Sequence, residues 1–219
     1  MLTLSLMDKT GTGKLFLVKK LFPALFFFLP FFSIAQDLEP EKKEAALIKS
    51  CAANTVKRKS PDILEIKLTN GKVLSFTNKE ADEATEKYTF EGCFPSFNAY
   101  LLEVMGWETI AWNLVDKTNG SETTIASLPV LSPDKKRLIC TTSGENEEEL
   151  YSNYLEIWSF VNGKPKKVFE LSGMSWGAGK ATWINNTSVK VEAEKYDGTT
   201  TKKLKPKTVS LINGKWILK

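Results

Sequence analysis

Histidine is absent from the 219-residue sequence. This residue is the commonest general base in enzymes, the commonest neutral zinc ligand, and the proton carrier of serine and cysteine triads. Any catalysis would therefore depend on carboxylates, lysine or tyrosine. No motif in the chain arranges such groups for chemistry, so we expect a protein that is not an enzyme and uses neither a metal nor another cofactor.

Acidic residues gather in the segment SGENEEELYSNY, residues 143–154. Its glutamates are Glu145, Glu147, Glu148 and Glu149. Consecutive glutamates in a strand or loop point in different directions, and their spacing differs from that of a calcium-binding loop. We interpret the segment as a solvated connection between strands. The alternatives are a calcium site, or one acid of a carboxylate pair in a hydrolase that acts on glycans.

The sequence also lacks an apolar run long enough to span a membrane. The run at residues 21–34 has 14 residues and two prolines, whereas a spanning helix needs about 20. Three lysines precede the run: Lys14, Lys19 and Lys20. Ser33-Ile34-Ala35 follows as a small-residue cleavage site. We therefore predict a secretory signal peptide at residues 1–35 and export to the periplasm or the medium, without stable membrane insertion after cleavage. An uncleaved anchor is the alternative.

Neither sign of charge is in excess after the predicted signal peptide, where 26 basic and 25 acidic residues remain. A near-neutral, exported chain is not expected to bind nucleic acid. Lysines do cluster in TTTKKLKPKT, residues 199–208. Lysines with a proline typically protect an exposed β edge, which is our interpretation; binding to an anionic polysaccharide or membrane surface is the alternative.

Cysteine is scarce, with three residues in the chain. Export would place them in a compartment where disulfides form. Cys140 lies in the apolar stretch RLICTT and is predicted to be a small buried side chain. Cys51 and Cys93 then remain as a candidate disulfide. The sequence favours the alternative, three free and buried thiols.

The chain contains four Asn-Gly pairs. The pairs are Asn70-Gly71, Asn119-Gly120, Asn162-Gly163 and Asn213-Gly214. Asn-Gly between alternating apolar runs predicts a β-hairpin with a two-residue type I′ turn, because both residues tolerate positive φ. Four hairpins are therefore expected, the first over residues 63–77.

The flanks of the four pairs share one pattern. An apolar residue stands four positions before each Asn: Ile66, Val115, Trp158 and Val209. A polar residue stands three positions before: Lys67, Asp116, Ser159 and Ser210. This alternation predicts that the first set is buried and that the second set faces outward.

The spacing of the pairs indicates the β architecture. Successive pairs are 49, 43 and 51 residues apart, and repeats of about 40 to 50 residues are typical of propeller blades with four strands each. The segments between the pairs are expected to supply the other two strands of each blade. They begin with SFNAYLLEVMGW, PVLSPDKKRLICTTSG and ATWINNTSVKVEAEKYDG.

One of these segments carries a resemblance to a known family. LPVLSPDKKRLICTT, residues 128–142, resembles the Ser-Pro-Asp phrase of WD-like repeats in bacterial secreted and Tol-associated β-propellers. ATWINNTSVKVEAE is similar to a degraded copy. The resemblance covers about 90 residues and implies that the Ser-Pro-Asp turn joins the inner strands of a blade. The chain departs from the family at Lys135, where Gly is usual, and at Leu131, where Trp is usual. No catalytic residue is implied.

We therefore predict an all-β domain over residues 62–219, a propeller-like stack of three and a half to four antiparallel blades. The first hairpin has no strand pair before it, so either residues 79–94 supply further strands or the stack is open and capped. Residues 36–61 are expected to be a linker or a short helix that caps the stack or docks a partner. Its apolar side would comprise Ala45, Leu47, Ile48, Cys51 and Ala52.

The chain contains six tryptophans. Trp112, Trp158, Trp183 and Trp216 lie in strand patterns and are expected in the core. Trp107 and Trp176 lie among glycines, and we predict that they form the platform for any ligand. The expected function is an exported, non-enzymatic binding or scaffold module for an unidentified protein or glycan. A carboxylate-based glycan hydrolase and a structural envelope component are the alternatives.

Overall fold

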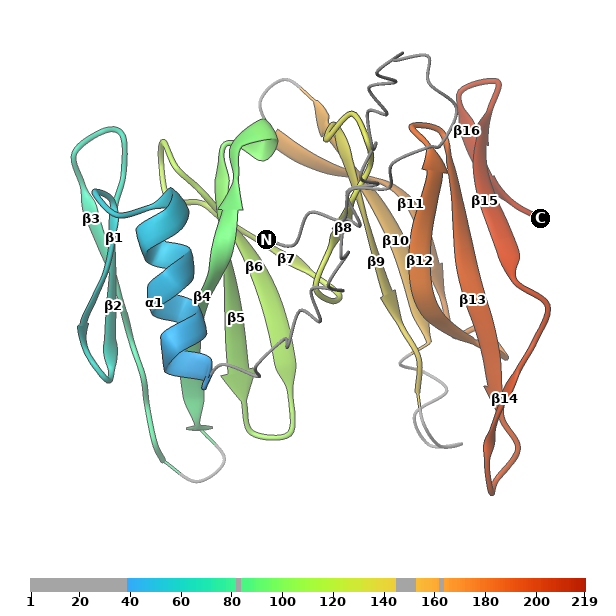
Figure 1. Cartoon of the computed structure of the whole chain (residues 1–219), viewed down its shortest axis with the longest axis horizontal. Coiled ribbons are helices and arrows are strands. Elements are labelled where there is room, and N and C mark those ends of the chain that lie inside the picture. Colours follow the sequence, from blue (N-terminus) through green and yellow to red (C-terminus); the bar gives the residue numbers. More distant parts are fainter. Residues whose placement is uncertain (1–38, 82–83, 145–152, 162–163) are drawn as a thin grey trace, which may run out of the picture. The chain divides into compact units, whose positions relative to one another are not determined.

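The computed structural model describes residues 39–81, 84–144, 153–161 and 164–219. The predicted signal peptide and the glutamates at 145–149 lie outside these residues. The described chain forms one helix and four antiparallel sheets (Figure 1). The prediction of a fold built from antiparallel β-sheets is therefore confirmed.

The helix and the first two sheets come from residues before 126. Helix α1 spans Pro40–Cys51. Sheet A has the order β1-β2-β3, with β1 Val56–Ser60, β2 Ile63–Lys67 and β3 Val73–Thr77. Sheet B has the order β4-β5-β6-β7, with β4 Glu86–Phe94, β5 Ala99–Gly106, β6 Ile110–Asp116 and β7 Glu122–Ile125. A 3₁₀ turn, Pro95–Phe97, links β4 to β5.

The remaining two sheets follow in chain order. Sheet C has the order β11-β10-β9-β8, with β8 Val130–Leu131, β9 Arg137–Thr142, β10 Tyr154–Val161 and β11 Lys164–Ser172. Sheet D has the order β12-β13-β15-β16, and β14 also pairs with β13. Its strands are β12 Gly177–Asn185, β13 Ser188–Tyr196, β14 Thr201–Lys203, β15 Lys207–Ile212 and β16 Lys215–Leu218.

Two expectations about boundaries change. Strand β1 lies within residues 36–61, which the sequence assigned to a linker or helix, so the β domain begins before residue 62. Strand β4 accounts for most of residues 79–94 and completes sheet B. Sheets B and C have four strands as expected, whereas sheet A has three and sheet D has five.

The predicted hairpins are present, but their turns differ. Of the three Asn-Gly pairs that the structure describes, Asn213 (49°) and Gly214 (77°) alone both have positive φ, as a type I′ turn requires. At the first two pairs only the glycine has positive φ, and five residues separate the strands. There the Asn70 and Asn119 side chains accept hydrogen bonds from the N–H groups two residues on (2.9 and 2.8 Å). This local hydrogen bond stabilises a longer loop than the pair alone predicts.

The third Asn-Gly pair, residues 162–163, is not among the residues that the structure describes. Their neighbours Val161 and Lys164 are register partners in the β10–β11 hairpin.

The predicted burial of the apolar set is confirmed at all four hairpins. Of the polar set predicted to face outward, Lys67 is exposed, whereas Asp116, Ser159 and Ser210 are half-buried. Ile66, Val115 and Val209 are fully buried, and Trp158 is 8% exposed. Alternation in a strand places these side chains on the inner face of each sheet. Full burial of one such side chain contributes about 1.5–3 kcal/mol, so the repeated position is a main source of stability.

Neighbouring sheets pack face to face in chain order. Leu64 and Ile66 of sheet A share a buried cluster with Phe90 and Leu102 of sheet B. A second cluster joins Leu101 and Leu114 of sheet B to Leu138 and Trp158 of sheet C. A third joins Ile139 and Ile157 of sheet C to Val189 and Val209 of sheet D. Sheets B and C therefore bury both faces.

The Ser-Pro-Asp turn at residues 132–134 joins β8 to β9. Ser132 is buried; its hydroxyl donates to the Asp134 carboxylate (2.6 Å) and accepts from the Arg137 N–H (3.0 Å). Lys135 has a φ of 57°, a conformation that favours glycine. A second Ser-Pro-Asp, Ser60–Asp62, joins β1 to β2 and was a signal for β1 that the sequence analysis missed.

Replacing Lys135 by glycine should increase stability. The left-handed conformation costs a residue with a Cβ about 1–2 kcal/mol, and glycine loses part of this gain to chain entropy. We expect Lys135→Gly to raise the free energy of unfolding by about 0.5–1 kcal/mol, measured by denaturant unfolding. The neighbouring Lys136→Gly is the matched control and should lower it by a similar amount. Equal destabilisation by both variants would contradict the prediction.

The cysteine interpretation needs a correction. Cys51 and Cys93 form a disulfide, with 6.1 Å between their Cα atoms, so three free thiols is wrong. The pairing follows from tertiary structure, because Cys51 ends α1 and Cys93 lies near the end of β4, beside which α1 packs. Cys140 is free and buried as predicted, and burial together with the charge of Glu156 raises the pKa of its thiol to about 12.

A disulfide is typical of an oxidising compartment outside the cytoplasm. Within the described residues, no helix has both the length and the apolar character needed to cross a bilayer.

Thiol labelling should distinguish the two disulfide-bonded cysteines from the free, buried Cys140. We expect iodoacetamide at pH 8 to label no cysteine in the native protein, one after unfolding, and all three after unfolding with reductant, as read by mass spectrometry. Reduction should also lower the free energy of unfolding by about 3–4 kcal/mol, because the disulfide closes a long loop. A Cys51→Ala/Cys93→Ala variant should be insensitive to reductant. Three labelled thiols in the unfolded, unreduced protein would contradict the disulfide.

Candidate functional site

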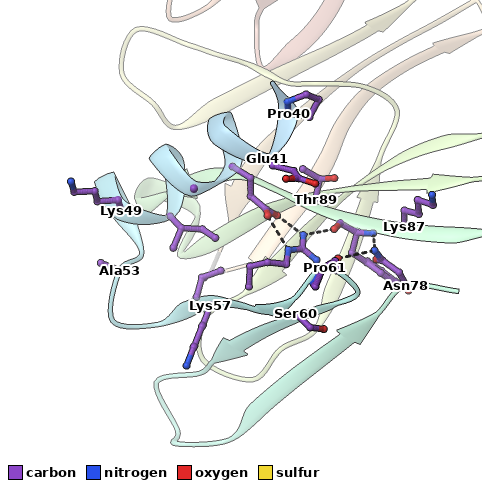
Figure 2. A pocket seen from close by; sticks show the side chains of 16 residues that line it. Pro40, Glu41, Lys49, Ala53, Lys57, Ser60, Pro61, Asn78, Lys87 and Thr89 are labelled. Atoms are coloured by element: carbon purple, nitrogen blue, oxygen red, sulfur yellow. Dashed lines mark hydrogen bonds and ion pairs between the residues drawn. The ribbon is translucent and has the colours of Figure 1, made fainter. Parts of the chain in front are cut away.

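A hollow lies between α1, β1 and β4, and we name it the α1 groove (Figure 2). Its volume is about 880 Å³. One side of α1 forms the upper wall, the residues of β1 and the turn after it form the lower wall, and Lys87–Thr89 of β4 form the far end. The groove therefore depends on how α1 is placed against the two strands.

Helix α1 has local reasons to form at this position. Pro40 occupies the first turn, where its missing N–H has no cost, and Glu41 lies beside it. Lys49 lies in the last turn, so both charges complement the helix dipole. The predicted helix within residues 36–61 is confirmed.

The buried side of α1 differs from the predicted one. Leu47, Ile48 and Ala52 pack against the core as expected. Ala45 and Cys51 are exposed, whereas Glu44 is buried. Glu44 is buried because it forms an ion pair with Arg58 of β1.

Glu44 and Arg58 form a two-pronged ion pair. The carboxylate accepts hydrogen bonds from Nε and Nη2 of Arg58, at 2.9 and 2.5 Å. It also accepts from the backbone N–H of Phe90 (2.7 Å), while Arg58 Nη2 donates to the carbonyl of Tyr88 (2.6 Å). The pair thus connects α1 and β1 and satisfies two backbone groups on the outer edge of β4.

The rest of that edge is also occupied. The Tyr88 N–H donates to the side-chain oxygen of Asn78 (3.0 Å). Glu86 exchanges backbone hydrogen bonds with Lys79 (2.8 and 3.0 Å). Free edges of sheets invite pairing with other chains, and here side chains and a short bridge close the edge of β4.

The edge of β1 is different. The Lys67 N–H donates to the Thr55 carbonyl (2.7 Å), and hydrogen bonding alternates along an antiparallel pair. Lys57 therefore pairs with Glu65 on β2, and the backbone N–H and C=O of Arg58 turn away from sheet A. Because Arg58 lines the α1 groove, its outward-facing backbone N–H and C=O border the groove. The N–H of Val56, the preceding outward-facing residue, donates to the Ala52 carbonyl (2.8 Å).

The rim of the groove is positively charged. Lys49 and Lys57 lie at one end and Lys87 at the other (Figure 2). Lys87 pairs with Glu80 (2.7 Å), and this hydrogen bond raises its pKa. Along the described chain neither Lys49 nor Lys57 forms an ion pair. Between the charges, Ile48 and Val56 provide apolar surface.

Tyr88 contributes a neutral hydroxyl to this wall. Burial, followed by the hydrogen bond and charge of Glu86, raises the pKa of the phenol above its usual value. The side chain therefore remains an uncharged donor over the whole physiological pH range.

The predicted tryptophan platform lies elsewhere. Trp107 is 54% exposed in the β5–β6 turn of sheet B. Trp176 is partly buried before β12, packs against the cluster between sheets C and D, and has Lys207 Nζ 5.3 Å from its ring centre. No contact between the two is found in the described residues, and neither lines the α1 groove. A ligand role for either stays a prediction.

The strand tryptophans behave as expected. Trp158 is buried, and the others are partly buried against the core: Trp112, Trp183 and Trp216.

Sequence reasoning missed Glu44 and Arg58. A signal existed, because positions 44, 47, 48 and 51 follow the i, i+3, i+4, i+7 spacing of one helix face. A glutamate on that face requires a buried partner. The sequence does not say which of the many basic residues is the partner.

Comparison with known proteins gives no match: no protein-family model fits the chain, and no curated protein is significantly similar to it. The resemblance to WD-like repeats therefore remains an expectation.

A double-mutant cycle tests the ion pair. Glu44→Gln and Arg58→Met should each lower the free energy of unfolding by about 2–4 kcal/mol, because each leaves a buried charge without its partner. The double variant should lose less than the sum, with a coupling of about 1–3 kcal/mol measured by denaturant unfolding. Glu39→Gln, which removes the exposed pair with Lys42, should change stability by less than about 0.5 kcal/mol. Additive effects at Glu44 and Arg58 would contradict the bridge.

Proposed function

We propose that the protein is an exported, non-enzymatic binding module of propeller-like build, whose α1 groove holds an extended segment of a partner protein. The observation that carries this proposal is the backbone of Arg58, which turns away from sheet A on its β1 edge and borders the α1 groove. An extended peptide adds to such an edge through main-chain hydrogen bonds, and pockets for alternate side chains supply specificity.

The strand count supports this mode. Sheet A has three strands, whereas sheets B and C have four. A segment bound along β1 would give sheet A a fourth strand and would lie under α1. Ile48 and Val56 would contact apolar side chains of that segment, and Lys49 and Lys57 favour acidic side chains beside them.

The groove is also pre-organised. The disulfide fixes the C-terminal end of α1 to β4, and the Glu44–Arg58 pair fixes the middle of the helix. A rigid site has less conformational entropy to lose on binding, which favours affinity. The closed edge of β4 leaves β1 as the groove edge open to pairing.

A hydrolase is less well supported by this site. It would need two carboxylates free to act as acid and as base or nucleophile. Of the acids lining the groove, Glu41 and Glu44, the second is engaged by Arg58 and the Phe90 N–H.

A displayed library of random decapeptides tests the proposal. Peptides selected on the mature protein should share an acidic, alternating apolar pattern and should lose at least tenfold in affinity for Ala45→Trp, which fills the groove. Ala46→Trp is the matched control, because Ala46 is exposed on the same helix but does not line the groove. Selected peptides that bind both variants equally, or no selection at all, would overturn the proposal.

A further inference from the structure

A second hollow lies between sheets C and D, and we name it the C–D cleft. Its volume is about 530 Å³. We propose that the C–D cleft binds an acidic saccharide, with its carboxylate or sulfate group held by Arg137, Lys166 and Lys215 and its ring against Trp216. This site shares no residue with the α1 groove and does not rest on the function proposed for that groove.

The first wall of the cleft is a row of three residues across sheet C. Ser159 of β10 is the register partner of Arg137 on β9 and of Lys166 on β11. Directly opposed residues on one face have their Cβ atoms about 4.5–5.5 Å apart. A hydroxyl therefore lies between two cationic side chains, a set of donors that suits a carboxylate or a sulfate.

Arg137 is held in place by the neighbouring turns. Its Nη1 donates to the Asn186 carbonyl (3.3 Å) in the β12–β13 turn and lies 3.5 Å from the Asp134 carboxylate. The Asp134 N–H in turn donates to the Asn186 side chain (3.0 Å). These contacts fix one side of the guanidinium and leave its other N–H groups for a ligand.

The second wall comes from the β15–β16 hairpin of sheet D. Leu211 and Trp216 are register partners there, and Lys215 follows the Asn213-Gly214 turn. The tight turn, with positive φ at both residues, places Lys215 at the mouth of the cleft. Lys215 and Trp216 are consecutive in β16, so their side chains leave opposite faces of the strand, and Lys215 borders the cleft from beside the turn.

No acidic residue lines the cleft in the part of the chain that the structure describes. Lys167 also lines the cleft, but its ammonium forms ion pairs with Glu156 (3.1 Å) and Glu170 (3.0 Å). Its charge is therefore not included among the cations that face a ligand. Lys166 and Lys215 form no ion pair with the described residues. Asp134 offsets part of the charge of Arg137, and a bound anion would relieve the remaining repulsion among Arg137, Lys166 and Lys215.

The aromatic wall favours a sugar as the carrier of the anion. Trp216 is partly exposed and is held by an edge-to-face contact with Trp183, with 6.1 Å between ring centres. A fixed, partly exposed indole offers a flat apolar surface beside the charges. The C–H face of a saccharide ring fits such a surface, whereas a free inorganic anion makes no use of it.

Calorimetry with the full mature chain tests the site. The probes are a glucuronate-containing oligosaccharide, a sulfated oligosaccharide of the same length, and inorganic phosphate alone. We expect at least one saccharide to bind, with affinity that falls as salt rises and a change in tryptophan fluorescence that Trp216→Phe reduces. The comparison of the two saccharides identifies carboxylate or sulfate as the bound group.

Variants make the test specific. Lys166→Gln/Lys215→Gln should weaken saccharide binding at least tenfold. Lys190→Gln/Lys195→Gln removes the same charge from exposed lysines of β13 outside the cleft and should change affinity less than twofold. Equal weakening by both double variants, the absence of saccharide binding, or phosphate binding as tight as that of the saccharides would each overturn the proposal. Unchanged thermal unfolding of both variants shows that the comparison is made on folded protein.

Discussion

The buried ion pair between Glu44 and Arg58 is the interaction on which the first half of the domain depends. Burying two charges has a large desolvation cost, and such a pair is retained where its remaining hydrogen-bonding groups find partners. Here the Phe90 N–H and the Tyr88 carbonyl on the edge of β4 are two such partners, whereas Arg58 Nη1 is buried without a hydrogen-bond partner among the described residues. The same two side chains therefore hold the helix, complete the hydrogen bonds of a strand edge and form the inner surface of the α1 groove.

The disulfide acts at a different point and in a different way. It joins residues 42 positions apart and stabilises chiefly by restricting the unfolded chain. The ion pair instead sets the orientation of α1 in the folded state. Since Glu44 and Cys51 are two turns apart on the helix, two attachments fix its direction as well as its position. A groove between a helix and a strand keeps its width only when both are fixed.

Features that depend on neighbouring residues were predictable from the sequence, whereas contacts between distant segments were not. The hairpins and the burial of Ile66, Val115 and Val209 follow from turn chemistry and from alternation within one strand. Strands within residues 79–94 were left as one of two alternatives, because a bulge between Phe90 and Gly92 interrupts the alternation of β4. The disulfide, the Glu44–Arg58 pair and the Arg137–Ser159–Lys166 row each depend on pairing between separate segments, for which one sequence offers many equivalent candidates.

Both hollows occur where a sheet departs from four strands. Sheet A is one strand short, and the α1 groove lies beside its unpaired edge. Sheet D has five strands because β14 takes part of the edge of β13 before β15 pairs with the rest. Its last hairpin, β15–β16, forms one wall of the C–D cleft. The α1 groove follows from the missing fourth strand of sheet A, whereas the C–D cleft has its other wall on four-stranded sheet C. A smaller hollow of about 340 Å³ lies on four-stranded sheet B, so room for a ligand does not require an irregular sheet.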